Sequence, residues 1–193
     1  MLNFKAYPWL LAVLLAGPAQ AAWQLDGESS RLTFVTTKVT NVAGVNRFRS
    51  LRGSVSDDGK VQLRVPLETV DSAIALRDER LRKQLFEIDK FASADISAQL
   101  DIAPLLTLAA GAQMELRLPL TVTLHGHTQN YNGELLVTRL DDRRFQVVTL
   151  APLVLNADDF GLAAGIEALR QLAGLKTISL AVPVSAVLIF SAG

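Results

Sequence analysis

The sequence predicts an all-β fold with two short helices, built as an eight-stranded antiparallel β-barrel. Hydrophobic and polar residues alternate along several stretches, most clearly at 113–124, where every second residue from Met114 to Leu124 is apolar. A period of two is typical of strands with one buried face. Turn residues separate these stretches, and about eight strands with short turns indicate a closed barrel or a sandwich. A barrel also leaves no exposed edge strand.

The same alternation and the turn residues define the strands in order. The expected strands span 31–40, 51–55, 61–65, 95–100, 113–124, 131–140, 145–155 and 177–190. Asp58-Gly59 predicts a hairpin between the second and third, since both residues tolerate positive φ. Pro119 cannot donate to a ladder, so we expect a bulge, a bend or an edge there. Asp141-Asp142 and Gly126 mark further turns.

Two segments have a helical rather than a strand period. The first spans about 76–88, where Leu81, Leu85 and Ile88 repeat at i, i+4 and i+7. The second spans about 160–175 with a similar apolar stripe. We expect Asp158 or Asp159 to cap its start and Gly174 to end it.

The N-terminus has the features of an export signal. Lys5 precedes an apolar run at 9–17, and Ala19-x-Ala21 matches a signal-peptidase site. The run is too short to cross a bilayer, which needs roughly twenty residues. We therefore predict a signal peptide at 1–21, cleaved after Ala21, and one mature domain at 22–193. An uncleaved membrane anchor is the alternative.

Composition excludes several classes of function. The formal net charge is zero, so nothing favours binding of nucleic acid. The chain has no cysteine, which excludes disulfides, thiol catalysis and cysteine zinc sites. No later segment predicts stable insertion into a membrane. Export and the absence of cysteine fit a bacterial periplasm.

The polar residues give little support to an enzyme. His125 and His127 would share one face of a strand, but a metal site needs further ligands, which carboxylates would have to supply. Turn and cap chemistry accounts for the paired aspartates. Arg47 and Arg49 share a face and would either meet an anionic head group or lie on a solvated surface. The charges at 77–82 allow ion pairs along the helix. We predict no catalytic residue, no metal and no cofactor.

The order of motifs resembles the YceI-like family, the lipocalin-like polyisoprenoid-binding proteins of bacteria. The resemblance covers Trp23 to Phe190 and rests on WQLD at 23–26, SRLTF at 30–34, the return from Phe48 to Gly53, VDS at 70–72, RDERLR at 77–82 with Phe86 and Lys90-Phe91, residues 120–128, and DDFG at 158–161. It implies an elongated lipocalin-like barrel in the periplasm that holds an amphiphilic isoprenoid-like lipid, a polyisoprenoid or an isoprenoid quinone. Many relatives carry a histidine where this chain has Lys38, which implies a different head group or none.

The inward faces predict the lining of the barrel, and none of these positions is charged. The candidate ligand-binding residues are Phe34, Phe48, Leu81, Phe86, Phe91, Ile96, Leu116, Leu118, Leu120, Phe160, Leu180 and Val182. A barrel of this size is either filled by side chains or hollow. The sequence leaves the two equal, and the resemblance favours a hollow barrel.

Three functions follow from these observations. The first is a binding protein that carries or sequesters an isoprenoid-like lipid. The second is a packed barrel without ligand that acts in interactions or stress protection. The third is a metalloenzyme that uses His125 and His127. Oligomeric state is open, and a homodimer through an exposed strand is one alternative.

Overall fold

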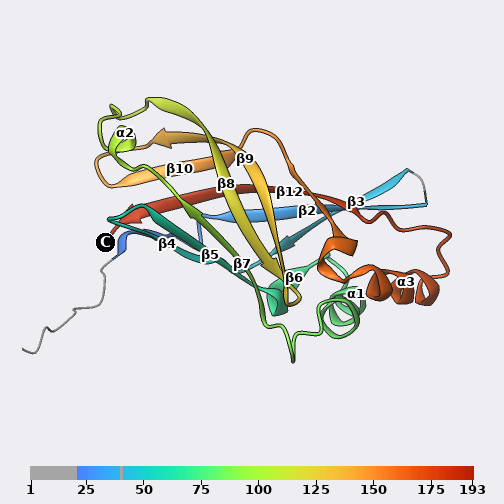
Figure 1. Ribbon diagram of the computed structural model, residues 1–193. Helices are drawn as coiled ribbons and strands as arrows, with labels where there is room; N and C mark the ends of the chain where they lie inside the picture. Colours follow the sequence, from blue (N-terminus) through green and yellow to red (C-terminus); the bar gives the residue numbers. More distant parts are fainter. Residues whose placement is uncertain (1–20, 40) are drawn as a thin grey trace, which may run out of the picture.

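The computed structural model describes residues 21–39 and 41–193. Figure 1 shows an elongated antiparallel barrel with helices at both ends. Helices α1 (Ala75–Arg80) and α3 (Ala163–Leu172) lie together at one end, whereas α2 (Ala103–Leu106) and the C-terminus lie at the other. The predicted signal peptide, except for Ala21, falls outside the described residues.

Eight strands close the barrel in a ring. The ring consists of β1 (Ala21–Leu25), β4 (Arg52–Ser56), β5 (Lys60–Pro66), β7 (Ser93–Gln99), β8 (Gln113–Leu124), β9 (His127–Arg139), β10 (Arg144–Thr149) and β12 (Ala181–Ala192). Pairing of β1 with β12 completes the ring, with Leu25 opposite Phe190. All these pairs are antiparallel, which confirms the predicted barrel.

Further strands extend the ring toward α1 and α3. They are β2 (Arg31–Lys38), β3 (Val42–Phe48), β6 (Val70–Asp71) and β11 (Leu153–Asn156). Both β2 and β11 pair with the long β12, β3 pairs with β2, and β6 pairs with β3. The single strand predicted at 145–155 is therefore two strands. Pro152 lies in the break, and its lack of an N–H explains why the ladder with β9 does not continue.

The position of Pro119 follows from the pairing of β8. This strand pairs with β9 along its whole length, but β7 pairs only with Thr121, Val122 and Thr123. Pro119 therefore lies where one side of β8 has no ladder, which is the edge among the three alternatives that the sequence predicted.

The two predicted hairpin turns differ in conformation. At Asp58-Gly59 only Gly59 has a positive φ, of 80°. At the β8–β9 turn, both His125 (52°) and Gly126 (77°) do, as a type I′ turn requires. Strands β4 and β5 pair on either side of Asp58-Gly59, which confirms the predicted hairpin, although the paired positive φ occurs at His125-Gly126. Leu124 pairs with His127 across this two-residue turn.

Both predicted helices are present but are shorter than expected. Helix α1 continues into a π-helical turn at Leu81–Leu85, and α3 ends before Gly174, whose φ is 63°. The expected cap at Asp158 or Asp159 is wrong. Asn156 accepts a hydrogen bond from the Asp158 amide and caps a short 3₁₀ turn, Ala157–Phe160, while α3 has no side-chain cap.

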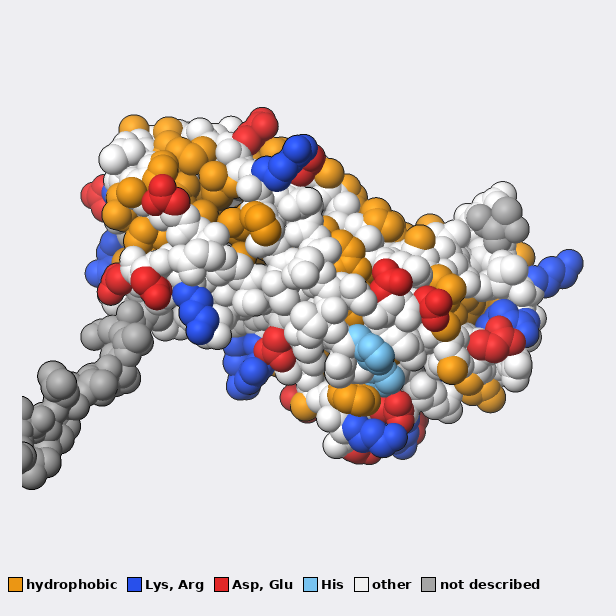
Figure 2. Space-filling model, viewed as in Figure 1, with side chains coloured by type: hydrophobic (Ala, Val, Ile, Leu, Met, Phe, Trp, Pro, Cys, Tyr) orange, Lys and Arg blue, Asp and Glu red, His pale blue; other side chains and the backbone are white. Residues whose placement is uncertain are grey.

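Helix α2 was not predicted. Pro104 lies in its first turn, where a missing N–H costs nothing, and the Asp101 carboxylate accepts from the Ala103 amide at 3.1 Å. Leu105 is buried against Val137 and Phe145, so this helix closes one end of the barrel. Figure 2 shows hydrophobic side chains gathered over the same end. No helix within the described residues has the length and apolar character needed to span a bilayer.

Candidate ligand-binding cavity

The barrel is hollow. A cavity of about 630 Å³ runs from Trp23, Leu105 and Phe145 at the α2 end to the helices at the other end. Cavities of roughly 300–1,000 Å³ with mostly apolar walls are typical of small-molecule sites. The question of a filled or a hollow barrel, which the sequence left open, is therefore answered by the structure.

Most of the predicted lining residues lie on the cavity wall. Those on the wall are Phe34, Phe48, Leu81, Phe86, Ile96, Leu116, Leu118, Leu120, Phe160 and Val182. They come from β2, β3, β7, β8, β12, the π-helical turn with the residue after it, and the 3₁₀ turn before α3. The alternating faces of the strands account for this arrangement, because successive side chains point to opposite sides of a sheet.

Phe91 and Leu180 are not among the wall residues. The Phe91 ring packs on His125, with 4.3 Å between ring centroids. Leu180 packs against the core, and its carbonyl accepts from the Ala157 amide at 2.9 Å. The prediction that Leu180 lines the barrel extended the strand alternation backwards from Val182. It was wrong because β12 begins only at Ala181, so the period of two does not reach Leu180.

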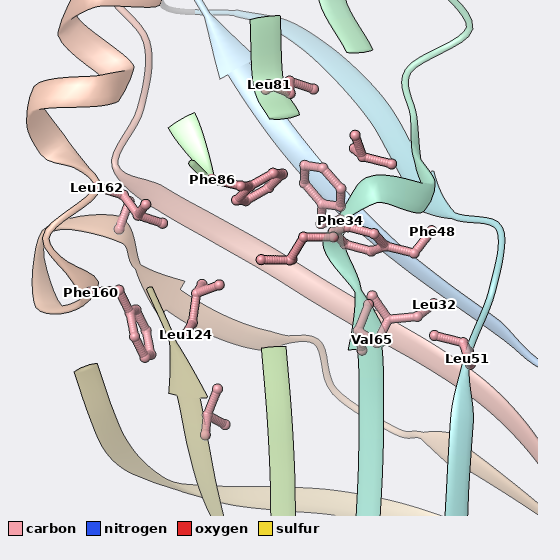
Figure 3. Packing of buried hydrophobic residues seen from close by; sticks show 14 of the residues in the cluster. Leu32, Phe34, Phe48, Leu51, Val65, Leu81, Phe86, Leu124, Phe160 and Leu162 are labelled. Carbon is pink, nitrogen blue, oxygen red and sulfur yellow. The ribbon is translucent and has the colours of Figure 1, made fainter. Parts of the chain in front are cut away.

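Three aromatic rings pack together on the cavity wall beside the π-helical turn. Ring centroids of Phe34 and Phe48 are 5.4 Å apart, and those of Phe48 and Phe86 are 6.1 Å apart. Figure 3 shows these three rings close together, with Phe86 coming from the helical segment and the others from strands. The helical segment therefore contributes directly to the wall.

The 3₁₀ turn before α3 also contributes an aromatic residue to the cavity wall. Phe160 is fully buried and stacks on Tyr131 with 6.4 Å between centroids. Leu162 and Leu124 lie near it in Figure 3. Gly161, with a φ of 67°, turns the chain away from Phe160 toward α3, and a Cβ there would lie 2.9 Å from His127 Nε2.

Few polar groups interrupt the apolar wall. Asn46 is 3% exposed, and its Nδ2 donates to the Thr36 hydroxyl at 3.2 Å and to the Phe34 carbonyl at 3.4 Å. Glu134 also reaches the wall, but its carboxylate binds Arg117 on the adjacent strand. The central part of the cavity thus suits a hydrocarbon chain.

Charged side chains lie at the end near α1, which corrects the predicted absence of charge in the lumen. Lys38, Arg77 and Arg80 are all half-buried and line the cavity there. Burial lowers the pKa of the Lys38 ammonium, and the nearby charge of Arg77 lowers it further. The sequence analysis did not place the two arginines on the cavity wall, because the charged residues at 77–82 were expected to form ion pairs along the helix. Within the described chain, that helix forms only the Glu79–Lys83 pair, at 2.8 Å.

Arg47 and Arg49 both pair with a buried carboxylate. Both lie near Asp71, at 2.9 and 3.1 Å, and the Asp71 side chain is 3% exposed. The hydrogen bond from Arg49, followed by those from the Ala73 amide and Arg47, holds the pKa of Asp71 well below its usual range. This cluster joins the β3–β4 region to β6.

His125 lies in the turn between β8 and β9, so the two histidines do not project from one strand as predicted. His125 Nε2 lies 3.0 Å from Glu87 Oε2, and its side chain is 13% exposed, so it is not a solvent-facing turn residue. His127 lies beside Gly161. The turn between them breaks the strand geometry on which the expected pairing depended. Among residues 21–39 and 41–193, no group of three His, Cys, Asp or Glu side chains is placed to hold a metal ion.

Fold and site together define a class of protein: a closed antiparallel barrel with a largely apolar internal cavity, plugged at one end and bordered by helices and cations at the other. A family model described as the YceI-like domain matches residues 23–190. The chain belongs to the YceI-like family.

Solved structures agree with this assignment. A polyisoprenoid binding domain from Saccharophagus degradans, implicated in plant cell wall breakdown, is 38% identical, with a TM-score of 0.88 over 90% of this chain and 100% of that one. BcnA from Burkholderia cenocepacia is 13% identical, with a TM-score of 0.66 over 86% of this chain and 98% of that one, and shares the fold. Curated proteins yield no match.

Proposed function

We propose that this protein binds an amphiphilic isoprenoid-like lipid, with the apolar chain inside the barrel, and carries or sequesters it in the periplasm. The observation that carries the proposal is the apolar cavity of about 630 Å³. The similarity to a solved polyisoprenoid binding domain, at 38% identity, supports the ligand class.

Desolvation supplies the affinity in this proposal. Each buried CH₂ group contributes roughly 0.8 kcal/mol, so a chain of several isoprene units binds without any polar contact along its length. The rings of Phe34, Phe48 and Phe86 offer flat apolar surfaces to such a chain. Asn46 donates a hydrogen bond to the Thr36 hydroxyl, so these two polar side chains are paired with each other. The wall therefore has few unpaired polar groups that would disfavour contact with a hydrocarbon chain.

The predicted export of the protein fits a role in an aqueous compartment. A signal peptide at 1–21 would deliver the barrel to the periplasm, where a free isoprenoid chain is insoluble. An enclosed cavity would keep the chain away from water during transfer. In this role the protein binds its ligand and performs no chemical reaction.

Native mass spectrometry with organic extraction tests the proposal directly. We expect protein purified from the periplasm to carry one isoprenoid-like molecule per chain. A ligand-free mass that persists after incubation with polyisoprenoids and isoprenoid quinones would contradict the proposal.

A pair of variants tests whether the cavity is the site. Leu118 lines the cavity and pairs with Gly133, so Leu118→Trp would fill the centre of the barrel. Val45 is 69% exposed, so Val45→Trp adds the same side chain outside the barrel. We expect the first variant to lose the lipid and the second to retain it. Equal lipid content in two folded variants would place the lipid elsewhere.

A further inference from the structure

Large hydrophobic side chains are exposed at one end of the barrel. Figure 1 places the end of the β2–β3 hairpin, α1 and α3 at this end of the molecule. Three separate segments contribute side chains that are more than one third exposed: Val39 and Val42 from the hairpin, Ile74 and Leu76 from the start of α1, and Leu172 from the end of α3. Ile74 and Leu76 also line the cavity, so this exposed surface is continuous with the cavity wall.

The three segments are neighbours in the fold. The Val39 amide donates to the Thr177 carbonyl at 3.0 Å, which holds the chain after α3 against the hairpin. Val42 pairs with Lys38 across the hairpin. Burial and then the nearby charge of Arg77 lower the pKa of Lys38, so α1 also lies close to the hairpin. The exposed side chains therefore gather at one place, and such a group of apolar residues marks an interaction surface.

The register of β3 shows that this surface extends the inner face of the barrel. Successive side chains of a strand point to opposite faces, so Val42 shares a face with Asn46 and Phe48. Those two residues line the cavity, whereas Val42 lies beyond it and is 60% exposed. Apolar contact made by the cavity wall thus continues outside the cavity, on a face that a partner could cover.

Cations accompany the exposed apolar residues. Lys38, Arg77 and Arg80 are half-buried beside the hairpin and α1, and Lys176 is exposed in the chain that follows α3. Within residues 21–39 and 41–193, none of these four takes part in an ion pair. Apolar side chains flanked by basic ones are typical of surfaces that bind at the interface of an anionic bilayer.

The acidic side chains of α1 and α3 have partners of their own. The Asp78 carboxylate is buried and accepts hydrogen bonds from the turn before α1. Glu79 pairs with Lys83 at 2.8 Å, and Glu167 pairs with Arg170 at 2.6 Å. The acids of these helices therefore leave the four cations available to anionic head groups.

We propose that this end of the barrel is a docking surface for an anionic lipid bilayer. Val42, Leu76 and Leu172 would enter the boundary between head groups and acyl chains, and the cations would lie among the lipid phosphates. The cavity would then open toward the bilayer, so that a lipid passes between membrane and barrel without crossing water. This inference goes beyond the proposed function, because docking does not depend on which molecule occupies the cavity.

Flotation with lipid vesicles tests the inference on protein purified from the periplasm. One set of vesicles contains phosphatidylcholine and phosphatidylglycerol in similar amounts, and the other contains phosphatidylcholine alone. We expect binding to the anionic vesicles to be about tenfold tighter, since several cations act close to the surface. This difference should shrink as salt is added. Failure to bind the anionic vesicles would overturn the proposal.

Two double variants locate the surface. Val42 and Leu172 are 60% and 53% exposed and do not line the cavity, so Val42→Glu, Leu172→Glu places two charges on the docking surface alone. Leu106 and Leu150 are 51% and 48% exposed and lie outside the three segments, so Leu106→Glu, Leu150→Glu is the matched control. We expect the first variant to bind anionic vesicles about tenfold more weakly than the control. Equal binding by the two folded variants would contradict the docking surface.

Two further measurements separate the inference from its alternatives. Native mass spectrometry should find the same lipid content in both variants, and loss of lipid from Val42→Glu, Leu172→Glu alone would assign these residues to the cavity instead. Sedimentation should find the same oligomeric state in both, and a dimer that only this variant dissociates would show that a second copy covers the surface. Either result would overturn the inference. Wild-type protein that binds vesicles but takes up no isoprenoid lipid would overturn the proposed function and leave the docking surface intact.

Discussion

Asp71 is a buried carboxylate whose charge two arginines and a backbone amide stabilise. Arg47 and Arg49 bind Oδ2, and the Ala73 amide donates to Oδ1 at 2.9 Å. The φ of Ala73 is 60°, an uncommon value for a residue with a side chain, so this local conformation needs support from its neighbours. Asp71 gives that support by fixing the turn between β6 and α1.

We predict that Asp71→Asn lowers the melting temperature by roughly 5 °C at neutral pH. The hydrogen bonds of Asp71 hold its pKa below the unfolded value of about 3.9, so they stabilise the fold above that pH. This stabilisation is lost as the pH falls through the lower folded pKa. The difference between wild type and variant, measured by thermal unfolding, should therefore be full at pH 7 and shrink below about pH 4.

Asp95→Asn is the control for this prediction. Asp95 also pairs with an arginine, Arg64, at 2.6 Å, but the Asp95 side chain is 42% exposed, against 3% for Asp71. Exposed ion pairs contribute little to stability. An equal loss in both variants would show that burial of Asp71 has no special effect.

At the scale of elements, the helices determine how the barrel ends are closed. Leu105 and Leu106 are adjacent in α2, yet Leu105 is 8% exposed and Leu106 is 51% exposed. We predict that Leu105→Ala destabilises the protein by about 3 kcal/mol through loss of buried contacts. Leu106→Ala should cost less than about 1 kcal/mol. Urea unfolding measures both values, and similar values would contradict the role of α2 as a plug.

Contact between α3 and the π-helical turn depends on Gly165. A Cβ at this position would lie 2.9 Å from the Gln84 carbonyl oxygen and 3.1 Å from Leu85 Cδ1. We predict that Gly165→Val destabilises the protein by about 1–3 kcal/mol and speeds hydrogen exchange at 81–85. Ala168→Val places the same side chain on an exposed position of α3 and should cost only about 0.5 kcal/mol. Unchanged exchange in Gly165→Val would argue against close packing of the two helices.

At the scale of the whole molecule, ligand binding and stability are linked through the cavity. A ligand at a hundred times its Kd stabilises the folded state by about 2.7 kcal/mol. For a chain of this size we predict a rise of about 5–10 °C in melting temperature with a polyisoprenoid ligand. Leu118→Trp should abolish this rise, and Val45→Trp should preserve it. A rise in both variants would exclude the barrel interior as the site.

Much of the fold and part of the site could be predicted because strand periodicity is a local property. The alternation at 113–124 matches β8 residue by residue, and it places Leu116, Leu118 and Leu120 on the cavity wall. The helical stripe at Leu81 and Leu85 likewise marks the segment that faces the barrel. Prediction failed at Leu180 and at 150–152, where the chain leaves regular strand geometry.

The sequence by itself determined the all-β class, the inward faces and the exclusion of disulfide or cysteine-metal chemistry. Only the tertiary structure decided that the barrel is hollow, that Arg47 and Arg49 bind Asp71, and that Lys38 and Arg77 line the same cavity. The physical reason is that periodicity reports which side of a strand or helix is buried. Which groups then meet depends on how the barrel closes and on how strands far apart in the sequence align, and no local pattern contains that information.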